Sequence, residues 1–286
     1  INMDEDSPED LCLDLLSRAS FGEKNYGRNI LGPAKNVRSF TREDLFRYKK
    51  ERYCPETIVI SFAGNLSPAQ AEDLAERFFG NLEKTPFANR KKEVGFASGN
   101  LFRKKPIEQA HFAFGFPAVE RENPAFPAVQ VMNTVLGGGM SSRLFKKVRE
   151  ELGLAYSVYS YSSHYEEAGL LTVYAGVNPQ KAEEAAAAVV SVIEELKKSG
   201  LSEEEFLRGR EQMKSGSIFS QENTSAQMLL YGKHLLYTGK VYDFEKRMAE
   251  ISALTRDDVM KAIEGNFDFA RAAVASIGNL KRGISL

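Results

Sequence analysis

The stretch Thr41-Arg42-Glu43-Asp44-Leu45 returns near the end of the chain as Thr255-Arg256-Asp257-Asp258-Val259. A second pair, Gly64-Asn65-Leu66 and Gly278-Asn279-Leu280, has the same spacing: 214 positions separate residue 41 from residue 255 and residue 64 from residue 278. A match without gaps at a fixed spacing indicates internal duplication. The sequence therefore predicts two related units in tandem.

The two copies differ in how much sequence precedes them. The second copy follows a long patterned stretch that begins near Pro106, whereas only 40 residues precede Thr41. We therefore expect about a hundred residues of the first unit to lie outside this sequence. The predicted domains are residues 1–81 as the incomplete C-terminal part of a first domain, 82–105 as a linker, and 106–286 as a complete second domain.

The composition is that of an ordinary soluble protein. The chain has 286 residues, of which 43% are hydrophobic and 27% charged. Thirty-eight basic and 39 acidic residues give a net charge of −1, which favours neither nucleic acid nor an anionic membrane as partner. Two cysteines, Cys12 and Cys54, are too few for a disulfide framework, and no apolar run reaches the roughly 18 residues of a membrane span. We expect a cytoplasmic location.

The elements before the linker are predicted mainly from capping residues and apolar spacing. Ser7 and Pro8 are typical of a helix start, and Thr41 with Asp44 indicates a second helix that runs to about Tyr53. The predicted elements that follow are a strand Thr57–Ala63 and a helix from Ser67 to Gly80 with Leu74, Phe78 and Phe79 facing inward.

The linker is rich in basic residues, among them Lys84, Arg90 and Arg103. One interpretation is a basic contact surface. The interpretation that the pattern favours is a solvated linker with one edge strand at most.

The second unit alternates between strand and helix patterns. Its predicted strands are Gln109–Pro117, Ala155–Tyr165, Gly169–Val177 and Ala270–Ile277, and its helices lie at about 125–136, 141–151, 179–198, 202–220, 225–237, 242–251 and 257–264. Strands first, then a run of helices and a returning strand, predict the α+β class with helices that cover antiparallel sheets.

The most distinctive local sequence is Leu136-Gly137-Gly138-Gly139-Met140-Ser141-Ser142-Arg143-Leu144-Phe145. Three glycines before a helix can form a backbone nest for an anion, but no Lys-Ser/Thr follows to complete a phosphate loop. The alternatives are a sharp turn between helices, with Ser141 or Ser142 as N-cap, and a flexible loop at a cleft.

Arg149 and Tyr156 follow this run, seven residues apart. A helix end and a strand start joined by a tight turn at Gly153 can place the guanidinium and the phenol side by side, where both donate hydrogen bonds to a peptide carbonyl or an oxyanion. The pattern alone favours a plainer interpretation, in which Arg149 pairs with Glu150 or Glu151 and Tyr156 fills the sheet.

The three histidines, His111, His164 and His234, are scattered. No His-x-x-Glu-His or Cys-x-x-Cys motif occurs, so no metal site is expected in this chain.

The runs Leu136–Leu144 and Arg149–Tyr156 resemble the C-terminal domain of the pitrilysin/insulinase family of zinc metallopeptidases, relatives of the mitochondrial processing peptidase. Met3–Pro8, Gly27–Gly32 and Gly64-Asn65-Leu66 resemble late segments of that family's N-terminal domain. The resemblance spans nearly the whole chain. It implies a mitochondrial-processing-peptidase-like tandem repeat of α+β domains around a peptide-binding chamber.

The resemblance also implies where the chemistry lies. In the family the catalytic zinc belongs to the first domain, where an inverted His-x-x-Glu-His motif and a downstream Glu hold the metal. No such motif occurs in this sequence, so zinc is expected only in an intact parent protein. The resemblance assigns Arg149 and Tyr156 to hold the substrate backbone and support the tetrahedral intermediate, and it places Gly137, Gly138 and Gly139 beside the substrate.

Two functions follow as expectations. The first is a fragment of a zinc-dependent metalloendopeptidase that supplies the substrate-binding second domain and is inactive alone. The second is a non-catalytic partner or scaffold subunit of a peptidase-like complex. The expected partners are a peptide substrate and either a second copy of the chain or a homologous subunit, because residues 1–80 would lack their usual partner strands and expose apolar surface.

Overall fold

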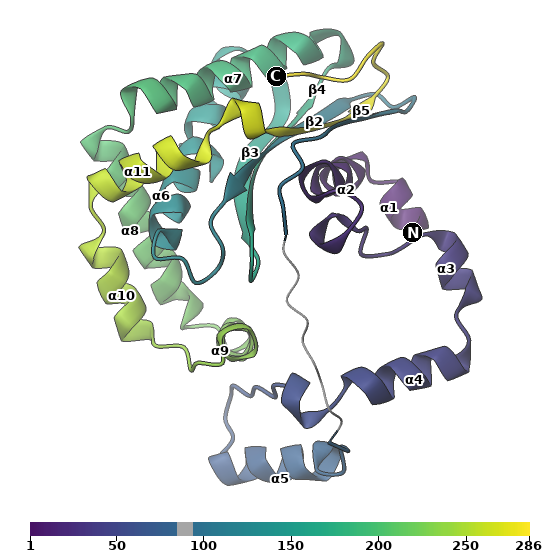
Figure 1. Cartoon of the computed structure of the whole chain (residues 1–286). Coiled ribbons are helices and arrows are strands. Elements are labelled where there is room, and N and C mark those ends of the chain that lie inside the picture. The colour runs from purple at the N-terminus through teal and green to yellow at the C-terminus, as the bar shows by residue number, and fades with distance from the viewer. Residues whose placement is uncertain (85–93) are drawn as a thin grey trace. The chain divides into compact units, whose positions relative to one another are not determined.

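A computed structural model describes residues 1–84 and 94–286, and part of the predicted linker, residues 85–93, lies outside this description. The chain forms two compact units (Figure 1). The sheet unit consists of Ile1–Gly32, Lys92–Met213 and Ile251–Leu286, and the smaller unit consists of Pro33–Lys91 and Lys214–Glu250. These units describe packing, and the division into domains at residues 81 and 105 stays a prediction.

The sheet unit is built on five strands in the order β1-β5-β2-β4-β3. The strands are β1 (Asn100–Lys104), β2 (Ala110–Ala118), β3 (Ala155–His164), β4 (Gly169–Val177) and β5 (Ala273–Gly278). Every pairing is antiparallel except that of β1 with β5, which is parallel. The α+β prediction is confirmed, and so are the β3–β4 hairpin and the returning strand.

One face of the sheet carries the main core. Phe112, Phe114 and Phe116 alternate along β2 and are fully buried in it, as the two-residue period of a strand requires. The helices that contribute to this core include α6 (Phe126–Gly137), α7 (Ala182–Ser199) and α11 (Arg256–Asn266). Figure 1 shows them together on that face.

The opposite face of the sheet is covered by α2 (Pro8–Phe21). Ser7 caps this helix as predicted, because its side chain accepts the Asp10 N–H, and Pro8 occupies the first turn. Leu11 and Leu16 are buried against Ala113 and other residues of that sheet face. A helix from the start of the chain therefore packs on strands that come about a hundred residues or more later in the sequence.

The remaining helices are mostly short. They are α1 (Asn2–Glu5), η1 (Asn25–Gly27), α3 (Ala34–Ser39), α4 (Arg42–Arg52), η2 (Pro55–Thr57), α5 (Pro68–Phe79), η3 (Phe145–Glu151), η4 (Pro179–Lys181), α8 (Glu203–Ser220), α9 (Thr224–Thr238), α10 (Phe244–Ala253) and η5 (Phe269–Arg271).

The duplication is visible in local geometry. Thr41 and Thr255 each begin a helix with a capping box, in which the threonine side chain and an aspartate three residues later satisfy each other's backbone N–H. Gly64 and Gly278 also match, with φ angles of 145° and 153°. Both angles lie in the region that favours glycine, which explains why this residue stands at both positions.

The two copies of the repeated sequence differ in whether their apolar segment pairs with strands of the sheet. The predicted strand Thr57–Ala63 is wrong, because residues 58–63 have no regular secondary structure. The matching strand β5 pairs with β1 and β2, whereas none of the described strands pairs with residues 58–63. The prediction that Leu74, Phe78 and Phe79 face inward is also wrong, since these side chains are 37%, 68% and 43% exposed.

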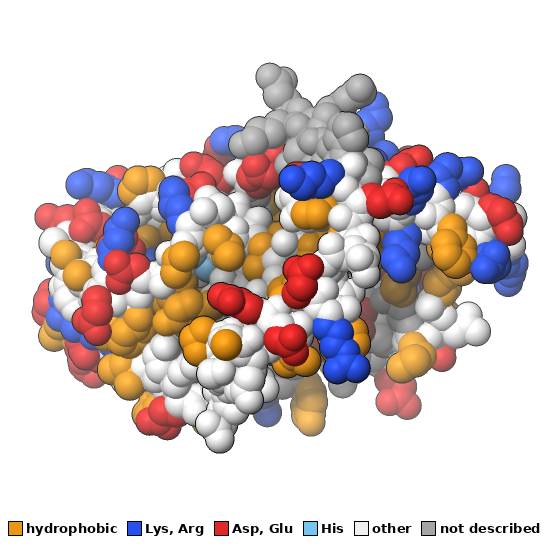
Figure 2. Space-filling model, turned by 90° about the horizontal axis from the view of Figure 1, so that it is seen from below, with side chains coloured by type: hydrophobic (Ala, Val, Ile, Leu, Met, Phe, Trp, Pro, Cys, Tyr) orange, Lys and Arg blue, Asp and Glu red, His pale blue; other side chains and the backbone are white. Residues whose placement is uncertain are grey.

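No helix among the described residues is long and apolar enough to cross a bilayer. Figure 2 shows acidic, basic and hydrophobic side chains intermingled over the face that it presents. This mixture agrees with a net charge of −1.

Candidate functional site

The glycine run stands at the end of α6, and its three members have different surroundings. Gly137 is buried, and a Cβ built on it would lie 2.4 Å from the backbone nitrogen of Ser160 on β3. Only glycine lets the helix approach the strand so closely. Close packing therefore accounts for Gly137 without any ligand.

Gly138 and Gly139 are exposed. A Cβ on Gly139 would meet nothing within 4 Å, so open space surrounds that residue. The next helical segment begins after Ser142, whose side chain accepts the Phe145 N–H at 3.4 Å. The run is thus a turn between helices with Ser142 as a capping side chain. Its assignment as a substrate contact rests on the two exposed glycines and stays a prediction.

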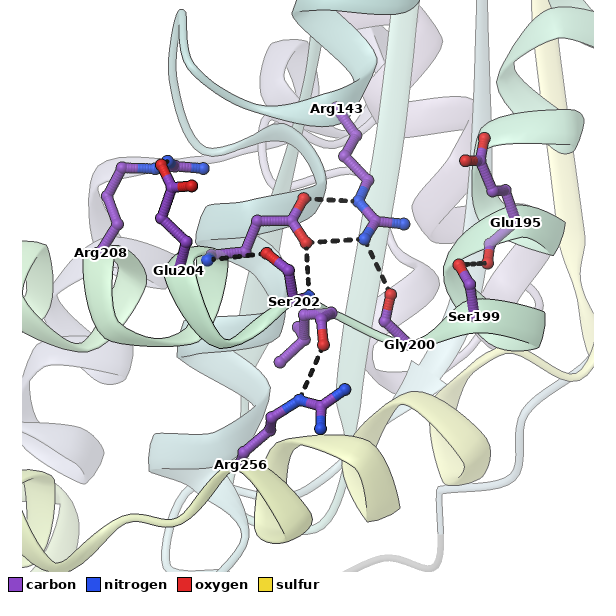
Figure 3. A network of polar contacts seen from close by, with 10 residues as sticks. Arg143, Glu195, Ser199, Gly200, Ser202, Glu204, Arg208 and Arg256 are labelled. Atoms are coloured by element: carbon purple, nitrogen blue, oxygen red, sulfur yellow. Dashed lines mark hydrogen bonds and ion pairs between the residues drawn. The ribbon is translucent and has the colours of Figure 1, made fainter.

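Arg143 ties this segment to the turn between α7 and α8 (Figure 3). Its Nε and Nη2 donate to the two carboxylate oxygens of Glu205 at 2.8 and 2.7 Å, and Nη2 also donates to the Gly200 carbonyl at 2.8 Å. Both charged side chains are about four-fifths buried, with 20% and 18% exposed. Glu205 also accepts the backbone N–H of Ser202.

The Arg143 guanidinium holds the pKa of Glu205 at about 2, against an ordinary 4.5. The same hydrogen bonds raise the pKa of Arg143. Arg256 reinforces the turn, because its Nε donates to the Leu201 carbonyl at 2.8 Å. Arg143 is therefore a structural anchor that fixes the segment leading to Arg149.

That segment, Phe145–Glu151, is a π-helix. It closes with hydrogen bonds from the N–H of Leu152 to the Lys147 carbonyl and from the N–H of Leu154 to the Val148 carbonyl. Gly153 then turns the chain with a φ of 59°. π-Helical turns are rare and occur often at functional sites, because the wider turn re-aims side chains.

Tyr156 follows this turn at the start of β3, which is an edge strand of the sheet. Ala155 pairs with Val177 and Ser157 with Gly176, so Tyr156 is the extra residue of a β-bulge. Its side chain is 73% exposed. The predicted interpretation in which Tyr156 fills the sheet does not fit this exposure. Bulges of this kind recur beside active sites, where they redirect a side chain.

Arg149 and Tyr156 lie together, which is the first of the two arrangements that their spacing allows. The guanidinium carbon of Arg149 is 5.5 Å from the centroid of the Tyr156 ring and 4.9 Å from that of Phe145. Arg149 is exposed and forms no ion pair within the part of the chain that the structure describes. Glu151 pairs with Lys147 instead, at 2.8 Å. The arrangement leaves guanidinium and phenol donors free for an acceptor.

The described residues do not suit a zinc ion. No three His, Cys, Asp or Glu side chains within residues 1–84 and 94–286 are grouped to hold a metal. His111 lies under α2, where its Nδ1 is 2.6 Å from the hydroxyl of Tyr174. His164 faces α6 and donates from Nδ1 to the Val119 carbonyl at 2.7 Å. The zinc expected from the family resemblance has no site among these side chains.

A polar cluster that the sequence did not predict lies under α2. Tyr159 donates to Glu9 at 2.5 Å, and Tyr174 lies beside His111. Burial and the Glu9 carboxylate raise the pKa of Tyr159, and burial lowers the pKa of His111. These residues are up to 165 positions apart, between 9 and 174, so no local pattern signals that they meet. The cluster joins α2 to the sheet.

Comparison with known proteins gives consistent results. A sequence profile described as "Peptidase M16 inactive domain" matches residues 39–213. A protein described as "Uncharacterized zinc protease YmxG" from Bacillus subtilis is 37% identical over 98% of this chain and 69% of its own length. An "Uncharacterized zinc protease" from Streptomyces coelicolor is 33% identical over 98% of this chain and 63% of its own length. The chain thus spans about two thirds of these relatives.

Solved structures agree on the fold. A peptidase M16 inactive domain from Pseudomonas fluorescens superposes with a TM-score of 0.85 and 21% identity, over all of this chain and 68% of the other. A chain of complex III2 from Candida albicans superposes with a TM-score of 0.83 and 16% identity, over 97% of this chain and 68% of the other. The predicted resemblance is confirmed: the chain belongs to the peptidase M16 family and carries the inactive domain of that family.

Proposed function

We propose that this chain supplies the substrate-binding second domain of a zinc-dependent metalloendopeptidase. In this proposal Arg149 and Tyr156 hold the backbone of a peptide substrate. The observation that carries it is the placement of the Arg149 guanidinium over the exposed Tyr156 ring, with the nearby Glu151 engaged elsewhere. The names of the relatives support a peptidase as parent protein.

The chemistry of the pair suits a peptide carbonyl. A guanidinium offers up to five N–H donors and a phenol one O–H donor. Hydrogen bonds from a charged donor contribute about 1.5–3 kcal/mol each. When negative charge develops on a carbonyl oxygen, such donors stabilise it more strongly than they stabilise the ground state. Gly138 and Gly139 lie at the exposed turn before this helix and belong to the same proposed surface.

Zinc belongs to the parent protein in this proposal. When bound there, it would activate water for attack on the scissile carbonyl. The residues of this chain bind and orient the peptide, and the chain by itself is proposed to be inactive. A cytoplasmic location remains part of the proposal, on the basis of the two unpaired cysteines, Cys12 and Cys54.

Peptide binding to the intact 286-residue chain tests the proposal. The probe is a short uncharged peptide of alanine, leucine and serine with blocked termini. Its binding is measured from the NMR chemical shifts of the chain as the peptide is added. Arg149→Ala should weaken binding about tenfold, because it removes a charge-assisted hydrogen bond. The control Lys146→Ala removes an exposed cation from the same helix and should leave the affinity unchanged. Equal affinities of Arg149→Ala and the unaltered chain would overturn the proposal.

A second candidate function is a non-catalytic subunit that pairs with a homologous chain. Exposed apolar side chains of the smaller unit support it, namely Leu45, Phe46, Phe62 and Phe78. Co-expression with a zinc-bearing homologue is the test. Peptidase activity that arises only in the mixture would select this function, and the absence of a stable complex would reject it.

A further inference from the structure

The aromatic ring of Phe145 lies four residues before Arg149 on the same helical segment. The Arg149 guanidinium carbon is 4.9 Å from the centre of this ring, which is closer than its 5.5 Å to the Tyr156 ring. Both distances lie within the reach of a cation–π interaction. Phe145 itself is only partly exposed, and its neighbour Val148 is fully buried.

A long side chain on a surface normally samples many rotamers. Fixing an arginine costs up to about 2 kcal/mol of side-chain entropy. Contact with two rings restricts the guanidinium without using a hydrogen-bond acceptor, because the attraction is to the faces of the rings. The N–H donors of Arg149 therefore stay available for a carbonyl oxygen.

The acidic neighbours do not compete for Arg149. Glu151 accepts from Lys147 Nζ at 2.8 Å, and no ion pair joins Arg149 to any described carboxylate. An arginine held by a carboxylate would have its donors occupied. Here the side chain is held by aromatic rings at a site where the backbone is irregular on both sides, with a π-helix before Gly153 and a bulge at Tyr156 after it.

We propose that Phe145 is a positioning residue. Its ring holds the Arg149 guanidinium beside Tyr156 so that a peptide carbonyl meets donors that are already oriented. This inference rests on the proposed function, in which Arg149 and Tyr156 contact the substrate backbone. Phe145 acts through Arg149 rather than on the substrate.

The first test reads the contact without any ligand. A ring next to a side chain shifts its proton resonances, so the Arg149 Hδ protons should be displaced upfield in the intact chain. Phe145→Leu removes the ring and should reduce the upfield shift of the Arg149 Hδ resonances. Phe145→Tyr keeps the ring and should preserve that shift. Lys146→Ala is the control and should leave the Arg149 Hδ resonances unchanged. An Arg149 spectrum that is the same in Phe145→Leu and the unaltered chain would overturn the inference.

The second test is affinity for the same blocked, uncharged peptide. Loss of an exposed cation–π contact corresponds to about a threefold effect, so Phe145→Leu should bind about threefold more weakly and Phe145→Tyr about as tightly as the unaltered chain. If Phe145→Leu does not fold, as judged from its amide spectrum, Phe145→Met provides the ring-free variant.

The two proposals fail in different ways. If Arg149→Ala weakens binding and the ring-free variant does not, the positioning role of Phe145 is refuted and the proposed function stands. If Arg149→Ala binds as well as the unaltered chain, the proposed function is refuted, and with it the role of Phe145 in substrate binding.

Discussion

The ion pair between Arg143 and Glu205 should dominate the stability of the turn between α7 and α8. The pKa of Glu205 is about 2 in the folded chain and 4.5 in its ordinary state. At roughly 1.4 kcal/mol per pKa unit, this difference corresponds to about 3 kcal/mol at neutral pH. The side chain is 18% exposed, so solvent screens the pair only weakly.

Replacing the carboxylate by an amide removes this contribution. Glu205→Gln leaves the Arg143 guanidinium buried beside a neutral partner and should lower the free energy of unfolding by about 2–3 kcal/mol at pH 7. The matched control is Glu204→Gln on the next residue. Glu204 pairs with Arg208 at 3.1 Å, but its side chain is 88% exposed, so the loss should stay below about 0.5 kcal/mol.

The effect should depend on pH in a defined direction. Because the folded pKa is the lower one, the stabilisation is complete above pH 4.5 and disappears as the pH falls toward 2. The difference between the unaltered chain and Glu205→Gln should shrink from about 2–3 kcal/mol at pH 7 to about 1 kcal/mol at pH 3.

Urea unfolding followed by far-UV circular dichroism measures the effect, since the chain has no tryptophan for fluorescence. Hydrogen exchange of the peptide that spans residues 200–207 localises it to the turn. The reasoning is refuted if Glu205→Gln and Glu204→Gln lose the same stability, or if the difference between the unaltered chain and Glu205→Gln is unchanged at pH 3.

Three further predictions concern packing, pH and association. Gly137→Ala should cost about 1–3 kcal/mol in urea unfolding because the new Cβ meets the Ser160 backbone, and Gly139→Ala, in open space, should cost little; equal losses would contradict the packing argument. Burial lowers the pKa of His111, so its contribution to stability is present above its unfolded pKa of about 6.5 and is lost below it; His111→Gln should flatten the fall in melting temperature between pH 7 and pH 5, and a slope equal to that of the unaltered chain would count against this role. Static light scattering should show concentration-dependent self-association, and Phe78→Ser should reduce it; a strictly monomeric chain at high concentration would disprove the expectation.

Local signals in the sequence were sufficient for most elements of the sheet unit. Ser7 and Pro8 define the start of α2, and the alternation along β2 defines its two faces, because caps and two-residue periods depend on neighbours in sequence. The strand predicted at Thr57–Ala63 failed for the opposite reason. Its apolar run carries the local preference, but a strand forms only where another strand supplies hydrogen bonds.

The candidate site was predicted in part. The spacing of Arg149 and Tyr156 and the family resemblance identified the pair as candidate site residues, and the structure places the two side chains together. The π-helix and the bulge were not predicted. Each arises from one extra residue in an otherwise regular element, and no characteristic residue types mark such an insertion in the sequence. The contact with Phe145 depends on that irregular turn.

The matched glycines at residues 64 and 278 make a comparison within one molecule possible. The sequence Gly-Asn-Leu begins at the last residue of a strand in one copy and, with a similar glycine φ angle, after a segment that pairs with none of the described strands in the other. Amide exchange rates of residues 273–278, set against those of residues 59–64, would therefore separate what strand pairing contributes to protection from what the local sequence contributes.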